Sequence, residues 1–406
     1  MVEFVNHVYR DLIQQYSSWN DLKTYLTSPA GGSLHISDAQ SPFCIIRSKH
    51  TPIPSATTPH SKWFRSTVWN METNRPVSVV PPKTSKEFMF TTCQELVEAG
   101  AFCQEFLDGV MITCFVTKGS NEVHITSRSK LDATGQFYSS KTFRQLFLEA
   151  YRGCEFALND DSTALLFTGD LDTEETGRSY SFLMQHVENR VVTPIACNRT
   201  FLVQWASIKE DGSVIVRDGL EDIPRIHMAP EGMTISEWVN LLFSEKDWTF
   251  QGVVFKDTKG NRWRFRNSAY LAIKGLRGNS AAHVDRFAQL YLRNMTQEYL
   301  KYYPEESFTF VCNNVFMNMI HQIVYNYYVQ VHITKTSVMN DIEPIYRRHV
   351  YQLHKYFVNV LRPEKKKIRH NEVVAYFYSL SWQSLVYLIK GIQDSYFSKM
   401  NEVVNQ

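Results

Sequence analysis

Residues 105–128 read EFLDGVMITCFVTKGSNEVHITSR, and this stretch decides how the first part of the chain folds. Two runs rich in β-branched and aromatic residues, GVMITCFV and EVHITSR, flank a link that contains Lys118 and Gly119. Such runs joined through glycine predict a β-hairpin. The preceding segment, Phe106-Leu107-Asp108-Gly109, therefore leads into a strand.

The same pattern extends from about residue 40 to 275. Turn signals separate paired runs, which predicts further hairpins and antiparallel sheets. The runs are FCIIRS, STVWNM with TNRPVSVV, FLVQWASI with GSVIVRD, and QGVVFKD with NRWRFRN.

From about residue 281 the apolar residues recur at helical spacing, as in FTFVCNNVFMNMIHQIVYNYYVQVHI and DIEPIYRRHVYQLHKYFVNVL. Glycine and serine in GLRGNS, residues 275–280, predict a linker. We therefore predict an α+β protein in which an antiparallel-sheet domain, residues 1–278, precedes an all-helical domain, residues 279–406.

The composition is that of a globular protein, because 44% of the 406 residues are hydrophobic. The 43 lysines and arginines barely exceed the 41 acidic residues, so any phosphate-binding surface has to be local. The seven cysteines form no Cys-x-x-Cys pair, and the thirteen histidines show no ligand spacing. We expect a reduced intracellular protein without a metal site.

The first residues, MVEFVNHVYRDLIQQY, predict an amphipathic helix rather than a secretory signal. Apolar residues recur at three- and four-residue steps: Phe4, Val5, Val8, Tyr9, Leu12, Ile13 and Tyr16. No uninterrupted apolar stretch reaches about 18 residues, so we expect a soluble, cytoplasmic protein with no membrane contact.

Five segments follow one another along the first domain. They are Phe64–Trp69 with Arg75-Pro76-Val77 and Lys86-Glu87-Phe88; Phe106–Gly109 with its hairpin; Phe182-Leu183-Met184 with Glu188–Val192; Gln251–Val254; and Trp263–Arg266 with Tyr270. Their order and spacing resemble the phage-type RNA ligase 1 family, the ATP-dependent tRNA-repair ligases of the nucleotidyltransferase superfamily. The resemblance covers most of the first domain and implies a nucleotidyltransferase fold followed by a helical domain.

The resemblance also implies where the chemistry of the family is lost. In the family a lysine attacks the α-phosphate of ATP to form a lysyl-AMP, and Phe106 stands at its position without a nucleophilic atom. Leu183 replaces the glutamate that holds the ribose. Gln251 replaces a glutamate linked to metal and nucleotide, and its side chain lacks the negative charge that favours a divalent cation.

Positive charge is retained where the family grips the α-phosphate with two lysines. Arg264 and Arg266 stand there and, as alternate residues of one strand, point to the same face. Guanidinium groups bind phosphate bidentately, but they stay protonated and cannot act as nucleophiles. The other residues that the resemblance assigns to nucleotide or RNA phosphate are Arg65, Lys86, Asp108, Gly109 and Arg190.

A lysine elsewhere is an alternative nucleophile. Lys83, Lys86 and Lys256 lie on segments at the expected pocket edge, whereas Lys118 lies in a hairpin turn. Of these, Lys86 matches a family lysine that helps to bind the triphosphate.

Structural interpretations stand beside the functional ones. Phe106, Leu183 and Trp263 then fill the former nucleotide pocket, and Asp108-Gly109 serves as a turn. Arg264 and Arg266 then pair with acidic residues or with solvent.

The helical domain carries one dense basic run between two predicted helices. Its members, Lys365, Lys366, Lys367 and Arg369, are the predicted RNA-backbone contact, with a merely solvated loop as the alternative. Clustered tyrosines, such as Tyr302 and Tyr325, mostly predict helix packing, and a minority are free to stack on unpaired bases.

These patterns predict a catalytically lapsed RNA ligase-like protein of viral or phage-related ancestry that binds RNA, tRNA-like in the family, or a protein partner. No cofactor is expected unless activity is retained, in which case ATP and Mg are required. Two alternatives stay open: an active ATP-dependent RNA ligase with a relocated lysine, and a structural or assembly protein with a filled nucleotide pocket.

Overall fold

The computed structural model describes residues 3–48, 58–85, 88–120, 122–152, 171–219, 223–227 and 232–404. The chain divides into two compact units, Met1–Lys274 and Gly275–Gln406, and each is described by itself. Antiparallel sheets build the first unit and the second is largely helical, which confirms the α+β class. The division falls inside helix α6 (Ser268–Arg277), so the predicted linker begins as helix.

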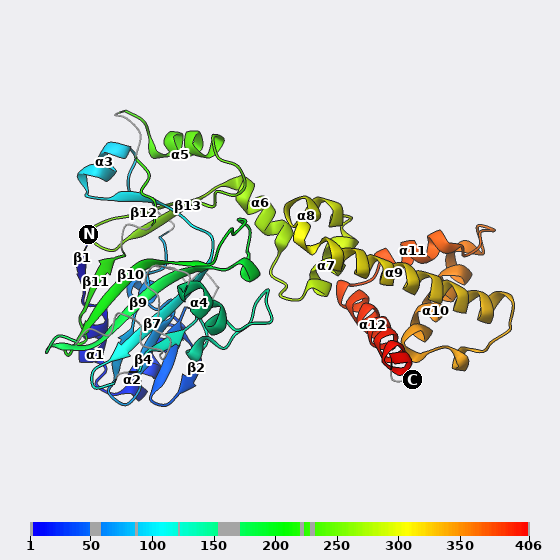
Figure 1. Cartoon of the computed structure of the whole chain (residues 1–406), viewed down its shortest axis with the longest axis horizontal. Helices are drawn as coiled ribbons and strands as arrows, with labels where there is room; N and C mark the ends of the chain where they lie inside the picture. Colours follow the sequence, from blue (N-terminus) through cyan, green and yellow to red (C-terminus); the bar gives the residue numbers. More distant parts are fainter. Residues whose placement is uncertain are drawn as a thin grey trace. The chain divides into compact units, whose positions relative to one another are not determined.

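The largest sheet has six antiparallel strands in the order β1-β11-β10-β9-β7-β8 (Figure 1). In that order they are β1 (Glu3–Asn6), β11 (Val214–Asp218), β10 (Arg199–Lys209), β9 (Glu175–Gln185), β7 (Val110–Thr117) and β8 (His124–Thr126). The predicted hairpins β7–β8 and β10–β11 are confirmed. Helix α4 (Phe143–Arg152) covers one face, with Phe147 against Phe182.

The N-terminal segment corrects the sequence prediction. Residues 3–6 form edge strand β1, and helix α1 (Val8–Gln15) begins only afterwards. Phe4 pairs with Val216 and Val5 with Ile215, so the open edge of the sheet captures apolar residues that periodicity alone assigned to the helix. The rest of the predicted helix holds, since its Tyr9, Leu12 and Ile13 are buried.

A second sheet has the order β2-β3-β4-β5. Its strands are β2 (His35–Gln40), β3 (Phe43–Arg47), β4 (Thr67–Asn70) and β5 (Arg75–Ser78), and the predicted β4–β5 hairpin is confirmed. Helix α2 (Trp19–Thr27) packs Leu22 and Leu26 into a core that also contains Trp69. A short 3₁₀ turn, η1 (Pro59–Trp63), precedes β4.

A third sheet has the order β13-β12-β6, with β13 (Arg262–Arg266), β12 (Gly252–Lys256) and β6 (Phe102–Glu105). The predicted β12–β13 hairpin is confirmed. Trp263, Phe255 and Cys103 share one face, which helices α3 (Cys93–Glu98) and α5 (Ile235–Ser244) bury. The opposite face carries the side chains of Arg262, Arg264 and Arg266, which alternate along β13 with Trp263 and Phe265.

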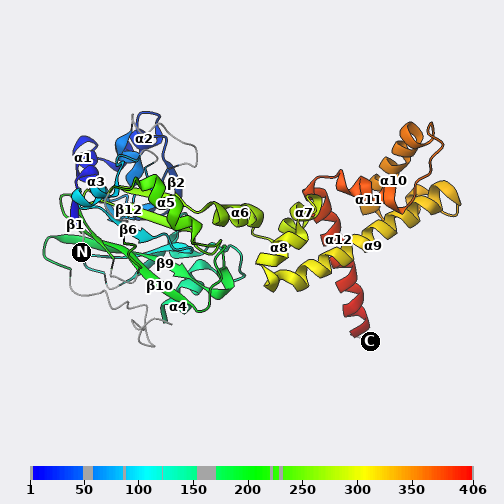
Figure 2. The ribbon, with the colours of Figure 1, turned by 90° about the horizontal axis from the view of Figure 1, so that it is seen from above.

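The described part of the second unit contains six α-helices, α7 to α12 (Figure 2). They are α7 (His283–Leu292), α8 (Thr296–Tyr302), α9 (Ser307–Tyr328), α10 (Pro344–Tyr356), α11 (His370–Tyr378) and α12 (Trp382–Val404). Five-residue π-helical turns, η5 (Val329–Ile333) and η7 (Phe357–Leu361), extend α9 and α10. Within the described residues, no helix is long and apolar enough to cross a membrane.

Candidate anion-binding site

The segment between β6 and β7 crosses from the three-stranded to the six-stranded sheet. Glu105 still pairs with Val253 of β12, whereas Val110 already pairs with Met184 of β9. The Phe106 amide donates to the Gly252 carbonyl at 2.9 Å, which ties the crossover to β12. Residues 106–109 are therefore fixed by both sheets.

Asp108 is a structural acceptor at this crossover. Its buried carboxylate accepts the Tyr270 hydroxyl at 2.8 Å and the amides of Val192 and Thr193 at 2.8 and 3.0 Å. Gly109 is required for a steric reason, because a Cβ there would lie 2.5 Å from the Met184 carbonyl oxygen. The Asp-Gly pair thus fixes the backbone at the start of β7.

The two other positions predicted to have lost catalytic side chains are also buried. Leu183 belongs to an apolar cluster, packed with Phe201, Val203, Ile223, Leu107 and Met111. Gln251 is buried at the start of β12, and its carbonyl accepts the Asn267 amide at 3.0 Å. The apolar cluster around Leu183 offers no hydrogen bond to a sugar hydroxyl.

Several cations lie around one face of β13, the face opposite Trp263. Arg262, Arg264 and Arg266 alternate with Trp263 and Phe265, so their side chains leave the sheet on one face. Arg65 is close enough to all three for their charges to act on it. We call the following residues the cationic cluster: Arg47, Arg65, Arg128, Arg262, Arg264, Arg266 and Lys274.

Burial and, after it, the repulsion between neighbouring cations lower the pKa values of this cluster. Burial, followed by neighbouring arginines, lowers the pKa of Arg65 to about 10. Burial lowers the pKa of Arg262 to about 10 as well, although Asp218 opposes the shift. Burial and the charge of Arg266 lower the pKa of Lys274, while Asp108 opposes. The guanidinium groups remain protonated at neutral pH, so the positive charge persists.

Several guanidinium atoms of the cluster are buried without a hydrogen-bond partner. They are Nε of Arg47, Nε and Nη1 of Arg262, and Nε of Arg266. A buried charged donor left unpaired is costly, so these atoms mark the cluster as a place where positive charge is poorly compensated. Phosphate oxygens match such donors in charge and geometry.

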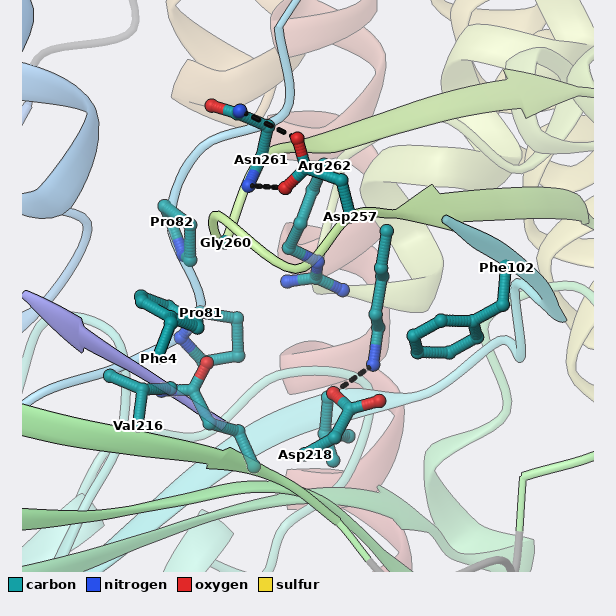
Figure 3. A pocket seen from close by; sticks show the side chains of 13 residues that line it. Phe4, Pro81, Pro82, Phe102, Val216, Asp218, Asp257, Gly260, Asn261 and Arg262 are labelled. Atoms are coloured by element: carbon teal, nitrogen blue, oxygen red, sulfur yellow. Dashed lines mark hydrogen bonds and ion pairs between the residues drawn. The ribbon is translucent and has the colours of Figure 1, made fainter. Parts of the chain in front are cut away.

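One end of the cluster borders a small cavity between the three-stranded and six-stranded sheets (Figure 3). Lys256 Nζ lies 2.7 Å from Asp218 Oδ1, and Arg262 faces the same space. Burial and Arg262 lower the pKa of Lys256 to about 8, against the opposing charge of Asp218. The cavity volume is about 20 Å³, which admits a single water molecule and no nucleotide.

Arg190 is not a member of the cationic cluster. Its Nε donates to the Val192 carbonyl at 2.9 Å, and its guanidinium lies 5.8 Å from the ring centroid of Trp248. Arg190 thus braces the loop that also binds Asp108. Lys86 lies outside the described residues.

The remaining predicted cations lie in turns and loops. Lys118 donates to the Thr173 carbonyl at 2.8 Å, and Lys83 is exposed. In the second unit the basic run occupies the exposed loop between η7 and α11: Lys365, Lys366, Lys367 and Arg369.

Within the described residues, one group of possible metal ligands is compact: Glu149, His186 and Glu188, with ligand atoms within 4.8 Å of one another. Lys141 Nζ already lies 2.9 Å from Glu149 and 2.6 Å from Glu188. The Glu188 amide donates to His186 Nδ1, and His186 Nε2 lies 3.0 Å from Glu149 Oε2. The carboxylates are therefore neutralised by an ammonium group, and this is a satisfied ion-pair network.

Four members of the cluster were not among the predicted site residues: Arg47, Arg128, Arg262 and Lys274. Arg47 and Arg128 lie at the ends of the runs FCIIRS and EVHITSR, so a signal existed in the basic residues near the ends of predicted strands. Only the arrangement of three sheets and α6 brings these residues to the same place.

Comparison with known proteins adds no further assignment. A scan against models of protein families finds no match, and a search of curated proteins finds none either. The family resemblance thus rests on the quoted motifs alone.

Proposed function

We propose that this protein binds RNA through the cationic cluster of a nucleotidyltransferase-like domain, related to phage-type RNA ligases, that no longer transfers adenylate. The observation that carries the proposal is a set of converging, largely uncompensated cations beside Phe106, which offers no nucleophile. Such a site retains phosphate recognition and lacks the group that would form a covalent intermediate.

The nature of the donors favours a phosphate ligand. Guanidinium groups hold oxyanions bidentately, and several donor atoms of Arg262 and Arg266 have no partner. The chain as a whole is nearly neutral, so these charges are concentrated by the fold and do not reflect a general basic excess. A polyanion with repeated phosphates fits a cluster spread over three sheets better than a single anion does.

Neither Lys256 nor Lys118 is placed to act as a relocated nucleophile. Lys256 has the lowered pKa that such a residue needs, but it is paired with Asp218 beside a cavity too small for ATP. Lys118 donates to a backbone carbonyl at the surface. The absence of a negative charge at Gln251 also weakens metal binding. The apolar packing of Leu183 weakens ribose binding.

Fluorescence anisotropy with a labelled transfer RNA tests the proposal. The double variant Arg264→Ala, Arg266→Ala should weaken binding at least about tenfold, because one hydrogen bond to a charged group contributes about 1.5–3 kcal/mol. Its salt dependence should flatten, since each phosphate contact adds about 0.7–0.9 to the slope of log K against log salt. The matched control is Arg10→Ala, Lys23→Ala, which removes two positive charges from α1 and α2. Equal affinity and slope in all three proteins reject the cluster as the RNA site.

Incubation with α-labelled ATP and magnesium or manganese, followed by intact mass analysis, separates the proposal from an active ligase. We expect no covalent AMP under conditions in which an active ligase is fully labelled. A stable adenylate would refute the lapsed-enzyme proposal, and peptide mapping would then identify the lysine.

A second candidate function, self-assembly, is favoured by the exposed face of α9. This 22-residue helix contains no Asp, Glu, Lys or Arg. Phe308, Val311, Val315 and Met319 are exposed along it, with Phe308 80% accessible. Exposed apolar residues at helical spacing mark an interaction surface. We assign a second copy of this chain to it, because an uncharged face does not repel itself.

Light scattering after size-exclusion chromatography tests this candidate. The wild-type chain should be dimeric at micromolar concentration, and Val315→Glu should be monomeric because two carboxylates would be buried at the interface. Asn314→Glu is the control, because Asn314 is exposed on the same helix but, as the residue next to Val315, is turned away from the apolar face. A monomeric wild-type chain would remove self-assembly from consideration.

A further inference from the structure

A groove with a volume of about 460 Å³ lies in the second unit, formed by α10, η7 and α11. This volume is in the range of about 300–1,000 Å³ that small-molecule sites occupy. Figure 2 places α10 and α11 in the helical unit. The groove is lined by Tyr356 and Tyr376, with Gln352, Lys355, Asn359 and Glu372.

The two tyrosines differ in how firmly they are held. Tyr376 is half-buried, and its hydroxyl pairs with His349 Nδ1 at 2.9 Å. Burial lowers the pKa of His349 to about 4, so this partner stays neutral at physiological pH. Tyr356 is 40% exposed. One side of the groove therefore carries the ring of Tyr376, which a hydrogen bond holds in place, and the other carries the exposed ring of Tyr356.

The basic run borders this groove. Residues 362–369 connect η7 to α11, and Lys365, Lys366, Lys367 and Arg369 are all exposed. The pKa of Lys366 is raised first by its ion pair with Glu364 and to a lesser extent by the proximity of Tyr356 and Glu372. Tyr356 and Glu372 line the groove, and the Lys366 amide donates to the Leu361 carbonyl at the end of η7 at 2.8 Å, so Lys366 lies close to the groove.

We propose that this groove binds an unpaired nucleotide of single-stranded RNA, with the base against Tyr356 and Tyr376 and the phosphate at Lys366. The inference rests on the proposed RNA-binding function. Aromatic rings beside cations are the chemistry that holds unstacked bases and their phosphates. A base in a duplex is already stacked and cannot enter, so the groove should discriminate single strands from duplexes.

The experiment uses the full chain and two fluorescein-labelled RNAs, a 12-nucleotide oligouridylate and a 12-base-pair duplex. Tyr356→Leu removes the ring but keeps an apolar side chain. Its matched control is Tyr387→Leu, because Tyr387 is 66% exposed on α12 and does not line the groove. We expect Tyr356→Leu to weaken oligouridylate binding roughly 5- to 100-fold, the range that stacking of one base spans. The control should bind like the wild type.

The outcomes separate this inference from the function on which it rests. Weakening by Tyr356→Leu that spares the duplex, together with a smaller salt slope in Lys366→Gln, supports the groove. Equal binding of oligouridylate by Tyr356→Leu and Tyr387→Leu, while Arg264→Ala, Arg266→Ala still weakens RNA binding, overturns the groove and leaves the cationic cluster. Equal weakening of single strand and duplex overturns the base-stacking assignment. Absence of RNA binding by the wild-type chain overturns both.

Discussion

The guanidinium of Arg266 lies 5.5 Å from the ring centroid of Phe106, at the crossover between two sheets. A cation over an aromatic ring contributes about 0.5–1 kcal/mol when exposed and more when desolvated. The pair thus keeps a positive charge at the crossover, but neither the guanidinium of Arg266 nor the ring of Phe106 can attack a phosphate.

Phe106→Lys should be less stable than wild type and should form no covalent AMP. The new ammonium would lie beside Arg266 and lose the ring contact, which we expect to cost about 1–2 kcal/mol. The apolar cluster around Leu183 would still leave the ribose without a partner. Urea unfolding and intact mass analysis after incubation with ATP measure the two effects.

Phe106→Leu is the control for this substitution, because it removes the ring without adding charge. It should lose less stability than Phe106→Lys. Adenylate on Phe106→Lys would show that the nucleotide site remains open, contrary to the packing of Leu183.

Asp108→Asn should destabilise the first unit by about 1–3 kcal/mol. The substitution leaves an amide group facing donors, since Asp108 accepts from the Tyr270 hydroxyl and from two backbone amides. Tyr270→Phe removes one of these three bonds and should cost about 1 kcal/mol. Urea unfolding checks both. If Asp108→Asn matched the stability of wild type, these three hydrogen bonds would not be what stabilises the crossover.

Inorganic tripolyphosphate should raise the melting temperature of the first unit. Binding to the folded state alone adds about 2.7 kcal/mol at a ligand concentration one hundred times Kd. For a unit of this size that corresponds to a shift of about 5–10 °C. Scanning calorimetry should show the shift for Arg10→Ala, Lys23→Ala but not for Arg264→Ala, Arg266→Ala. A shift that survives loss of both arginines would place the anion elsewhere.

Local patterns in the sequence were sufficient for the hairpins, because β-branched runs joined by turns pair with their immediate neighbours. They were insufficient for β1, where Phe4 and Val5 pair with a strand more than 200 positions away. The same limit applies to the candidate site. Arg264 and Arg266 were predicted to share a face by the alternation of a strand, whereas Arg47 and Arg128 join Arg65 only through the packing of separate sheets.

A buried ionic network lies at the start of the second unit. Glu306 accepts from Arg277 and Arg286, and the Tyr299 hydroxyl bonds both arginines. Burial alone would raise the pKa of the Glu306 carboxyl. The hydrogen bond from His283 and the charges of Arg286 and Arg277 outweigh burial and lower that pKa to about 2.

The second unit should lose about 2–3 kcal/mol of stability through Glu306 as pH falls from about 5 to 2. The folded pKa lies below the unfolded value of about 4.3, so the contribution is complete above pH 5 and disappears on protonation. Hydrogen exchange of α9 amides measures it. Glu306→Gln should be about 3–5 kcal/mol less stable at pH 7 and lack this dependence, because both arginines lose their counter-charge. The exposed control Glu298→Gln should behave like wild type. Equal acid sensitivity in Glu306→Gln would assign the effect to other groups, such as His321 and His349. The pKa values of these two histidines are lowered to about 4, so they destabilise the fold as pH falls from about 6.5 to 4.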